Sequence, residues 1–209
     1  PALASMLGSY TCPLKTADDM IEHLQDSIQN DFPACENVTV TIHEIAPQLR
    51  QTSAPAYYLI APLDSGGYHN IFYNPDSNAD TTSLFTTMAH EGFPGHLYQT
   101  VYFGRQSPSH IRYLIDYSGY VEGWATYVES YAYDYAADYL SAGTLSSQEA
   151  SACTRLSWLN RSVNLCIYSL IDIGIHYRGW DAARTAVFLK AFGINNASTA
   201  AEIYQYIVE

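Results

Sequence analysis

Apolar positions recur at helical spacing near the start of the chain and alternate with polar positions soon afterwards. Over residues 16–31 an amphipathic pattern follows Thr16 and Asp19, which together form a helix-capping sequence. Alternation over 37–45 and apolar runs over 56–61 and 68–74 predict three strands. The first 80 residues are therefore predicted to form one helix and a small antiparallel or mixed sheet.

The rest of the chain shows helical periodicity. Capping sequences are expected to start its last three helices, the first of which runs to about residue 176. Together these elements predict an α+β fold, mostly helical, as a single domain over 1–209. The helical segments cover 81–105 and 109–140 and then follow the caps Ser146–Glu149, Asp181 and Thr199–Glu202.

Charge narrows the classes of function. The net charge is −12 with only 9 Lys and Arg residues. This argues against binding to nucleic acid or to an anionic membrane surface, because both need basic residues. The chain contains no signal peptide and no membrane-spanning apolar run. Its abrupt ends indicate a processed or truncated piece, so this absence says little about location.

The four cysteines are not arranged as zinc ligands, because none forms a Cys-x-x-Cys pair. Cys12 and Cys35 flank the first predicted helix and could form a disulfide in an oxidising compartment. Otherwise these two residues, with Cys153 and Cys166, are expected to be buried free thiols.

The stretch HEGFPGH at 90–96 resembles the zinc-peptidase pattern His-Glu-x-x-His with two extra residues. In a regular helix six residues turn by about 600°, which leaves His90 and His96 roughly 120° and about 9 Å apart. Pro94 cannot sit inside a regular helix, and Gly95 permits unusual backbone angles. The pair therefore indicates a kink or bulge that could return His96 to the face of His90. The alternative is a loop between two helices with two incidental histidines.

A carboxylate on the next helix favours the metal site. Two His with one Glu from a neighbouring helix is a common catalytic zinc set, with the fourth position left for water, and Glu122 fits it. Glu129, two turns further along the same face, is either a partner that supports a ligand or a surface charge. Gly119 and Gly123 flank Glu122 and suggest close packing there, since glycine weakens a helix.

A third polar group lies on an otherwise apolar helix. Asp172 and His176 are spaced i and i+4, so they form either a hydrogen-bonded core pair or a group that faces the metal. In the second case His176 or a tyrosine would stabilise the developing oxyanion. Arg161, one of few cations, could hold a substrate carboxylate or pair with a surface acid.

Three stretches in combination resemble the bacterial "domain of unknown function 885" family, which is grouped with the zincin-like metallopeptidases. They are HEGFPGHLYQ (90–99), EGWATYVE (122–129) and DIGIHYRGW (172–180), and the preceding strand region is similar too. Family members are usually longer, with a large helical N-terminal part. The resemblance therefore implies a zincin-like C-terminal catalytic portion that works with that missing region. Many members carry lipoprotein or secretion signals, which implies an extracytoplasmic location.

The resemblance implies one Zn²⁺ held by His90, His96 and Glu122, with Glu91 as general base. We therefore expect a zinc peptidase acting on a peptide or protein. One of the strands before the motif, the strand over 68–74, would lie along the cleft and pair with an extended peptide. Alternatives are a metal-dependent hydrolase of another amide or ester, a non-catalytic zincin-like binding module, and a fragment inactive without its N-terminal part. The candidate substrate contacts are Tyr73, Asn74 and Arg161, and Asp172 joins Glu129 as a supporting residue.

Overall fold

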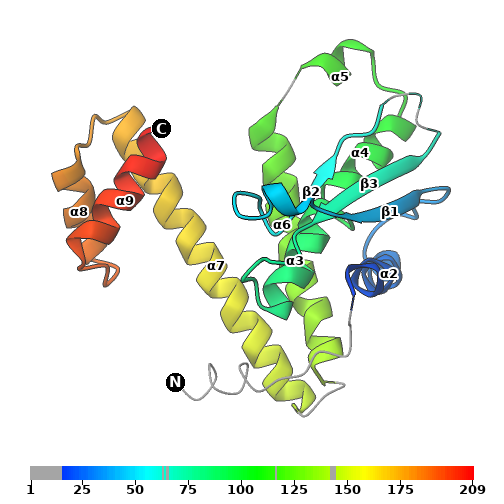
Figure 1. Cartoon of the computed structure of the whole chain (residues 1–209), viewed down its shortest axis with the longest axis horizontal. Coiled ribbons are helices and arrows are strands. Elements are labelled where there is room, and N and C mark those ends of the chain that lie inside the picture. The colour runs from blue at the N-terminus through cyan, green and yellow to red at the C-terminus, as the bar shows by residue number, and fades with distance from the viewer. Residues whose placement is uncertain (1–15, 63, 65, 116, 142–144) are drawn as a thin grey trace. The chain divides into compact units, whose positions relative to one another are not determined.

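The computed structural model describes residues 16–62, 64, 66–115, 117–141 and 145–209. It confirms an α+β fold that is mostly helical with one small sheet (Figure 1). The chain divides into two compact units, the first ending at Trp158 and the second spanning Leu159–Glu209. The change from sheet to helices near residue 80 falls within the first unit. The single domain expected over 1–209 stays a prediction.

The first unit opens with the predicted amphipathic helix, α2 (Ala17–Ser27), which continues into the 3₁₀ turn η1 (Ile28–Asn30). Its capping box is confirmed. The Asp19 amide donates to Thr16 Oγ1 at 3.0 Å, and the Thr16 amide donates to Asp19 Oδ2 at 2.9 Å. This exchange satisfies two amides that a helix start leaves without partners, so it fixes where α2 begins.

The three-stranded sheet is mixed and has the order β1-β3-β2. β3 runs parallel to β1 and antiparallel to β2, so it is hydrogen-bonded along both edges. The expectation that the strand at 68–74 pairs with a peptide is therefore wrong, because a central strand has no free edge. The strands are β1 (Thr39–Glu44), β2 (Ala56–Leu59) and β3 (Tyr68–Tyr73).

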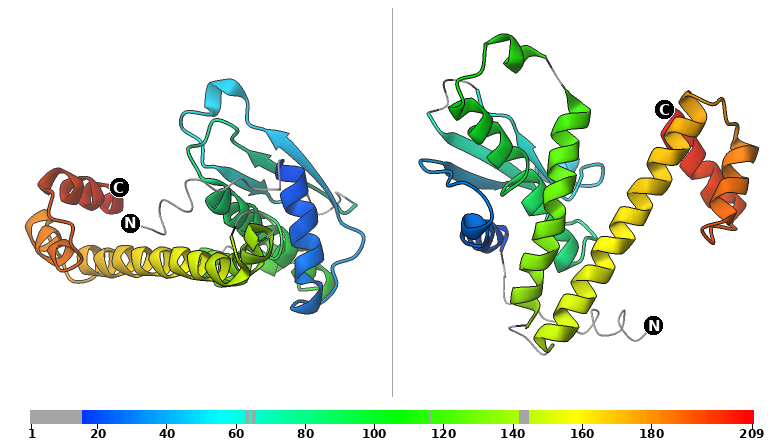
Figure 2. Two further views of the ribbon diagram at one scale, coloured as in Figure 1. Left: turned by 90° about the horizontal axis from the view of Figure 1, so that it is seen from below. Right: turned by 180° about the vertical axis from the view of Figure 1, so that it is seen from behind.

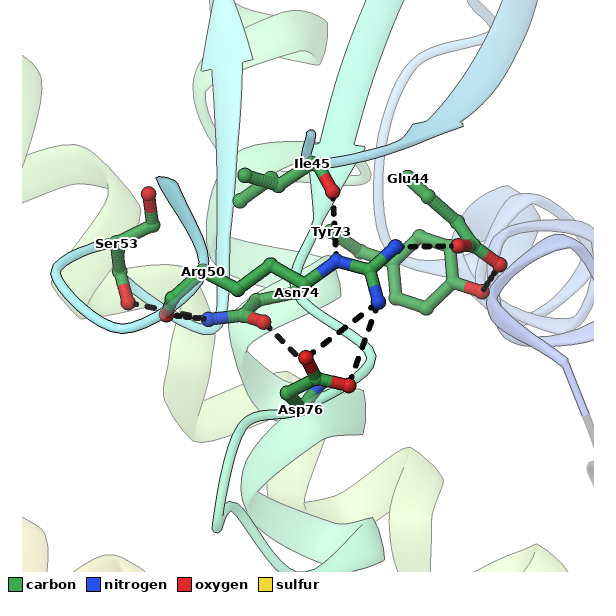
Figure 3. A network of polar contacts seen from close by, with 7 residues as sticks. All are labelled: Glu44, Ile45, Arg50, Ser53, Tyr73, Asn74 and Asp76. Carbon is green, nitrogen blue, oxygen red and sulfur yellow. Dashed lines mark hydrogen bonds and ion pairs between the residues drawn. The ribbon is translucent and has the colours of Figure 1, made fainter. Parts of the chain in front are cut away.

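A guanidinium holds the loop between β1 and β2, which contains the 3₁₀ turn η2 (Pro47–Leu49). Arg50 Nε donates to the carbonyl of Ile45 at 2.8 Å, and Nη2 donates to Glu44 Oε2 at 2.8 Å (Figure 3). Its other terminal nitrogen, Nη1, lies 3.4 Å from both carboxylate oxygens of Asp76. Arg50 thereby ties the loop that delivers β2 to the ends of β1 and β3.

Tyr73 and Asn74, the substrate contacts expected at the end of β3, make hydrogen bonds around this loop. Asn74 is buried, and its amide donates to the carbonyls of Arg50 at 2.7 Å and Ser53 at 3.3 Å (Figure 3). Tyr73 donates its hydroxyl to Glu44 Oε1 at 3.2 Å. Asn74 thus holds the loop through its amide, and the roles of Tyr73 and Asn74 toward substrate stay predictions.

The helical part of the first unit divides at two places, of which the first is the break predicted at Pro94 and Gly95. The segment 81–105 divides into α3 and α4, with a break over residues 92–95. The segment 109–140 divides into the short α5 and the long α6. α3 packs against α6 and against β2 and so lies at the centre of the unit (Figure 2). The helices are α3 (Thr81–Glu91), α4 (His96–Arg105), α5 (Ile111–Leu114) and α6 (Ser118–Ser141).

The core of the first unit joins α2, the sheet and α3. Its largest fully buried side chains include Phe85 and Met88 of α3, Leu24 of α2, Ile71 of β3 and Phe93 of the helix break. Burial of apolar area is the main favourable term in folding. It therefore fixes α3, the helix that carries the His-Glu stretch, against the core.

α7 (Ser147–His176) begins in the first unit behind the predicted Ser146–Glu149 capping box, which is confirmed. The second unit packs its own small core from Ile167, Ile171, Leu189 and Ala200. Asp181 caps α8 (Ala182–Lys190) as expected. The expected cap at Thr199 is wrong, because Asn196 is the N-cap of α9 (Ala197–Val208).

Two remaining expectations concern thiols and membranes. Cys35, Cys153 and Cys166 are free, and only Cys153 is buried, whereas Cys12 lies outside the described residues. Among the helices of the described ranges, none has both the length and the apolar character needed to cross a bilayer.

Candidate metal centre

The break between α3 and α4 keeps helical bonding but skips two residues. The amide of Gly95 donates to the carbonyl of Ala89 at 3.0 Å, and that of Tyr98 donates to Gly92 at 3.1 Å. Each bond spans six residues where a regular helix spans four. Two residues are therefore looped out, and His96 returns to the face that an i+4 residue would occupy. The predicted bulge is confirmed at the level of the backbone.

At position 95 the backbone passes so close to the carbonyl of His90 that only glycine fits. A Cβ atom built on Gly95 would overlap the carbonyl oxygen of His90 and crowd that of Ala89. Phe93, inside the loop, is buried in the core, and the Pro94 carbonyl accepts a hydrogen bond from Trp124 Nε1 at 2.9 Å. The insertion is thus packed on one side and hydrogen-bonded on the other.

Three side chains converge beyond the break. His90 Nε2 lies 3.4 Å from Glu122 Oε2, and His96 Nε2 lies 3.5 Å from Glu122 Oε1. Ligand atoms at about 2.1 Å from a tetrahedral zinc ion are about 3.4 Å from one another. The donor atoms of the three residues all lie within 4.8 Å of one another, so the group could hold a metal ion. The side chain of Glu122 is 63% exposed, which leaves one side of the group open to solvent.

His90 is held from behind by a buried carboxylate. Its Nδ1 lies 2.7 Å from Glu129 Oε1, and the Glu129 side chain is only 5% exposed. A carboxylate can only accept, so this bond places a proton on Nδ1 and leaves Nε2 available as a ligand. The sequence left two roles open for Glu129. Its burial excludes an exposed surface charge, and its contact with His90 supports the role of a residue that orients a proposed metal ligand.

Glu91 lies beside the group and contacts the sheet. Its Oε2 accepts a hydrogen bond from the backbone amide of Tyr58, in β2, at 2.8 Å. Burial raises the pKa of Glu91, whereas the Tyr58 amide and the neighbouring His90 lower it by a smaller amount. A carboxylate with a raised pKa accepts a proton more readily than an ordinary one.

The two histidines respond in opposite ways to their surroundings. Burial by itself lowers the pKa of His90, but the hydrogen bond and charge of Glu129, with Glu91 and Glu122, raise it overall. Burial and the charge of His90 lower the pKa of His96, and Glu122 offsets this only partly. Nearby carboxylates thus raise the pKa of both histidines, but only at His90 does this effect outweigh burial.

The other expected site residues lie in the second unit. His176 Nε2 lies 3.6 Å from Asp172 Oδ1 and donates to the carbonyl of Ile207 at 3.0 Å. Both side chains are more than half exposed, so the buried core pair is wrong. Arg161 is also exposed. The proposed roles of His176, Asp172 and Arg161 toward substrate stay predictions.

The glycines around Glu122 do not serve close packing. Apart from the adjoining residues and the backbone of the same helix, no described atom lies within 4 Å of a Cβ built on Gly119 or on Gly123. Sequence reasoning also missed Tyr58 and Trp124. Tyr58 acts through its backbone amide, which leaves no mark in the sequence, whereas Trp124 stands two positions after Glu122 within a motif already noted.

The fold and the site define a mostly helical α+β protein in which a broken helix and its neighbour bring together a His-His-Glu group. The chain belongs to the family described as bacterial protein of unknown function (DUF885), whose model matches residues 11–209. Among solved structures it is similar to a putative lipoprotein from Colwellia psychrerythraea, with a TM-score of 0.68 and 19% identity. That match covers 93% of this chain and 32% of the other, and it shows the fold alone. No curated protein matches the chain.

Proposed function

We propose that this chain is the catalytic region of a zinc-dependent peptidase of zincin-like type. The observation that supports this most directly is the convergence of His90, His96 and Glu122 with Glu91 beside them. Their spacing suits the small tetrahedral ion, and a set of three protein ligands leaves a position for substrate or water. Two imidazoles and one carboxylate suit zinc, and related sets bind other divalent ions.

The chemistry divides between the ion and the chain's own residues. When bound, Zn²⁺ supplies a Lewis acid that polarises a carbonyl and lowers the pKa of water. Glu91 takes a proton from the attacking water and returns it to the leaving amine. The Tyr58 amide holds one oxygen of Glu91, and Glu129 keeps the His90 ring in the tautomer that presents Nε2. Burial of Glu91 makes it a stronger base.

The strand that would bind an extended peptide is β2. It stands at the end of the sheet, and among the described strands only β3 pairs with it. Its Tyr58 amide already points away from β3 toward Glu91. In an antiparallel strand the amide and carbonyl of one residue face the same side, so the Tyr58 carbonyl also faces that edge. A peptide added there would lie next to the base.

Metal content and hydrolysis test the proposal together. We expect about one zinc per chain by elemental mass spectrometry in the purified protein, and its loss in His96→Ala. We expect Glu91→Gln to retain zinc and to lose peptide hydrolysis by at least about 10²-fold, the usual range for removal of a general base. Wild-type activity in Glu91→Gln would remove this residue as the base.

The other readings give different results in the same assays. Zinc binding with hydrolysis of esters or small amides, but not of peptides, would indicate another hydrolase. Zinc binding without any hydrolysis would indicate a binding module, or a portion that needs the additional chain length seen in the similar lipoprotein structure. We also propose an extracytoplasmic location, which the description of that structure as a putative lipoprotein supports.

A further inference from the structure

A hydrogen bond from Trp124, which is not one of the proposed metal ligands, holds the insertion between the two histidines. The Pro94 carbonyl belongs to the backbone that leads directly into Gly95 and His96. It accepts the hydrogen bond from Trp124 Nε1 at 2.9 Å, and Pro94 is buried. A buried carbonyl that loses its partner is costly, so this bond constrains where the insertion lies.

The indole of Trp124 is itself fixed by packing. The ring of Phe32 meets it edge-on at 6.2 Å between centroids. Phe32 in turn meets Tyr131 at 5.0 Å and Tyr98 at 5.9 Å, both edge-on. Edge-to-face contacts at these distances are favourable, and they come from both α4 and α6. The donor on Trp124 is therefore held in place before any ligand binds.

α6 reaches the metal group at three points. It supplies Glu122, it orients His90 through Glu129, and it fastens the insertion before His96 through Trp124. Trp124 lies about 200° around the helix from Glu122, so the two side chains leave α6 in different directions. One rigid helix thereby sets the positions of all three ligands.

We propose that Trp124 is a positioning residue for the metal site, and this rests on the proposed function. Its N–H fixes the looped-out segment so that His96 presents Nε2 to the same ion as His90. Zinc affinity then depends on Trp124 although the indole is not a ligand. Residues that orient ligands in this way typically contribute about 10–100-fold to metal affinity.

The test compares Trp124→Phe, which keeps an aromatic ring and removes the donor, with Trp158→Phe in the full chain. Trp158 packs on Tyr133 and gives a matched loss of one indole. Competition with a chromogenic chelator measures zinc affinity, and thermal unfolding without metal measures fold stability. We expect Trp124→Phe to bind zinc about 10–100-fold more weakly and Trp158→Phe to bind like the wild type. The visible spectrum of the Co²⁺ form should change only in Trp124→Phe.

The outcomes separate this inference from the function it rests on. Trp124→Phe that is folded and binds zinc as tightly as the wild type, with an unchanged Co²⁺ spectrum, overturns the inference and leaves the proposed function intact. A wild-type chain that binds no zinc overturns both. If Trp124→Phe does not fold, Phe32→Leu loosens the indole without removing its N–H. We then expect weaker zinc binding in Phe32→Leu, and unchanged affinity overturns the inference.

Discussion

Gly95 is the residue at which a single added methyl group should disturb the metal group. In Gly95→Ala the new Cβ atom would overlap the carbonyl oxygen of His90, which forces the backbone between the two histidines apart. We expect this variant to lose zinc binding and to unfold more readily, because backbone neighbours cannot move aside as a flexible side chain can. Elemental mass spectrometry and thermal unfolding measure the two effects.

Gly123→Ala is the matched control. Apart from the adjoining residues and the backbone of α6 itself, no described atom lies within 4 Å of its new Cβ. Ala also favours a helix over Gly by about 1 kcal/mol. This variant should therefore keep its zinc and unfold at a slightly higher temperature. Equal zinc content in both glycine variants would contradict the close approach assigned to Gly95.

At the residue scale, the sequence predicted the groups whose chemistry is specific to a side chain. His90, His96, Glu122 and Glu129 are recognisable because imidazole and carboxylate are the side chains that suit a zinc site, and the Pro94–Gly95 pair indicates the bulge that His96 needs. The contribution of Tyr58 was not predictable, since any residue has an amide and only the folded sheet brings this one to Glu91.

At the scale of elements, local patterns predicted the strands but not their neighbours. Alternation over 37–45 and apolar runs over 56–61 and 68–74 indicate strands whatever they pair with, so β1, β2 and β3 were found near their observed bounds. The order β1-β3-β2 depends on packing between segments far apart in the chain. The strand that pairs with a peptide was therefore expected to be β3, whereas the strands at the ends of the sheet are β1 and β2. The break in 81–105 was predictable because Pro94 cannot continue a helix.

The start of α9 gives a prediction about helix capping. Asn196 Oδ1 accepts hydrogen bonds from the amides of Ser198 at 2.8 Å and Thr199 at 3.1 Å. Asn196→Ala should therefore lower the stability of the second unit by about 1 kcal/mol. Thr199→Ala, an exposed change in the first turn, should cost close to nothing, because Ala is the better helix former. Amide hydrogen exchange in α9 distinguishes the two, and a larger loss in Thr199→Ala would restore the capping site first expected.

At the scale of the whole molecule, the candidate catalytic groups fall into two units. All three proposed ligands, with Glu91 and Glu129, lie in the first unit, and Asp172 and His176 lie in the second. The three motifs follow one another in a family order, yet sequence order does not say which groups act on one substrate. Changes in the second unit alone therefore leave the proposed metal ligands in place.

His176→Ala makes that separation. Since the ligands all belong to the first unit, we expect the variant to retain about one zinc per chain. If His176 stabilises the oxyanion, kcat for peptide hydrolysis should fall by about 10²-fold, the usual effect of removing one such donor. Tyr177→Ala changes the exposed neighbouring residue and should leave both quantities unchanged. Zinc retained with wild-type kcat in His176→Ala would limit His176 to its hydrogen bond with the Ile207 carbonyl, a contact that joins α7 to α9.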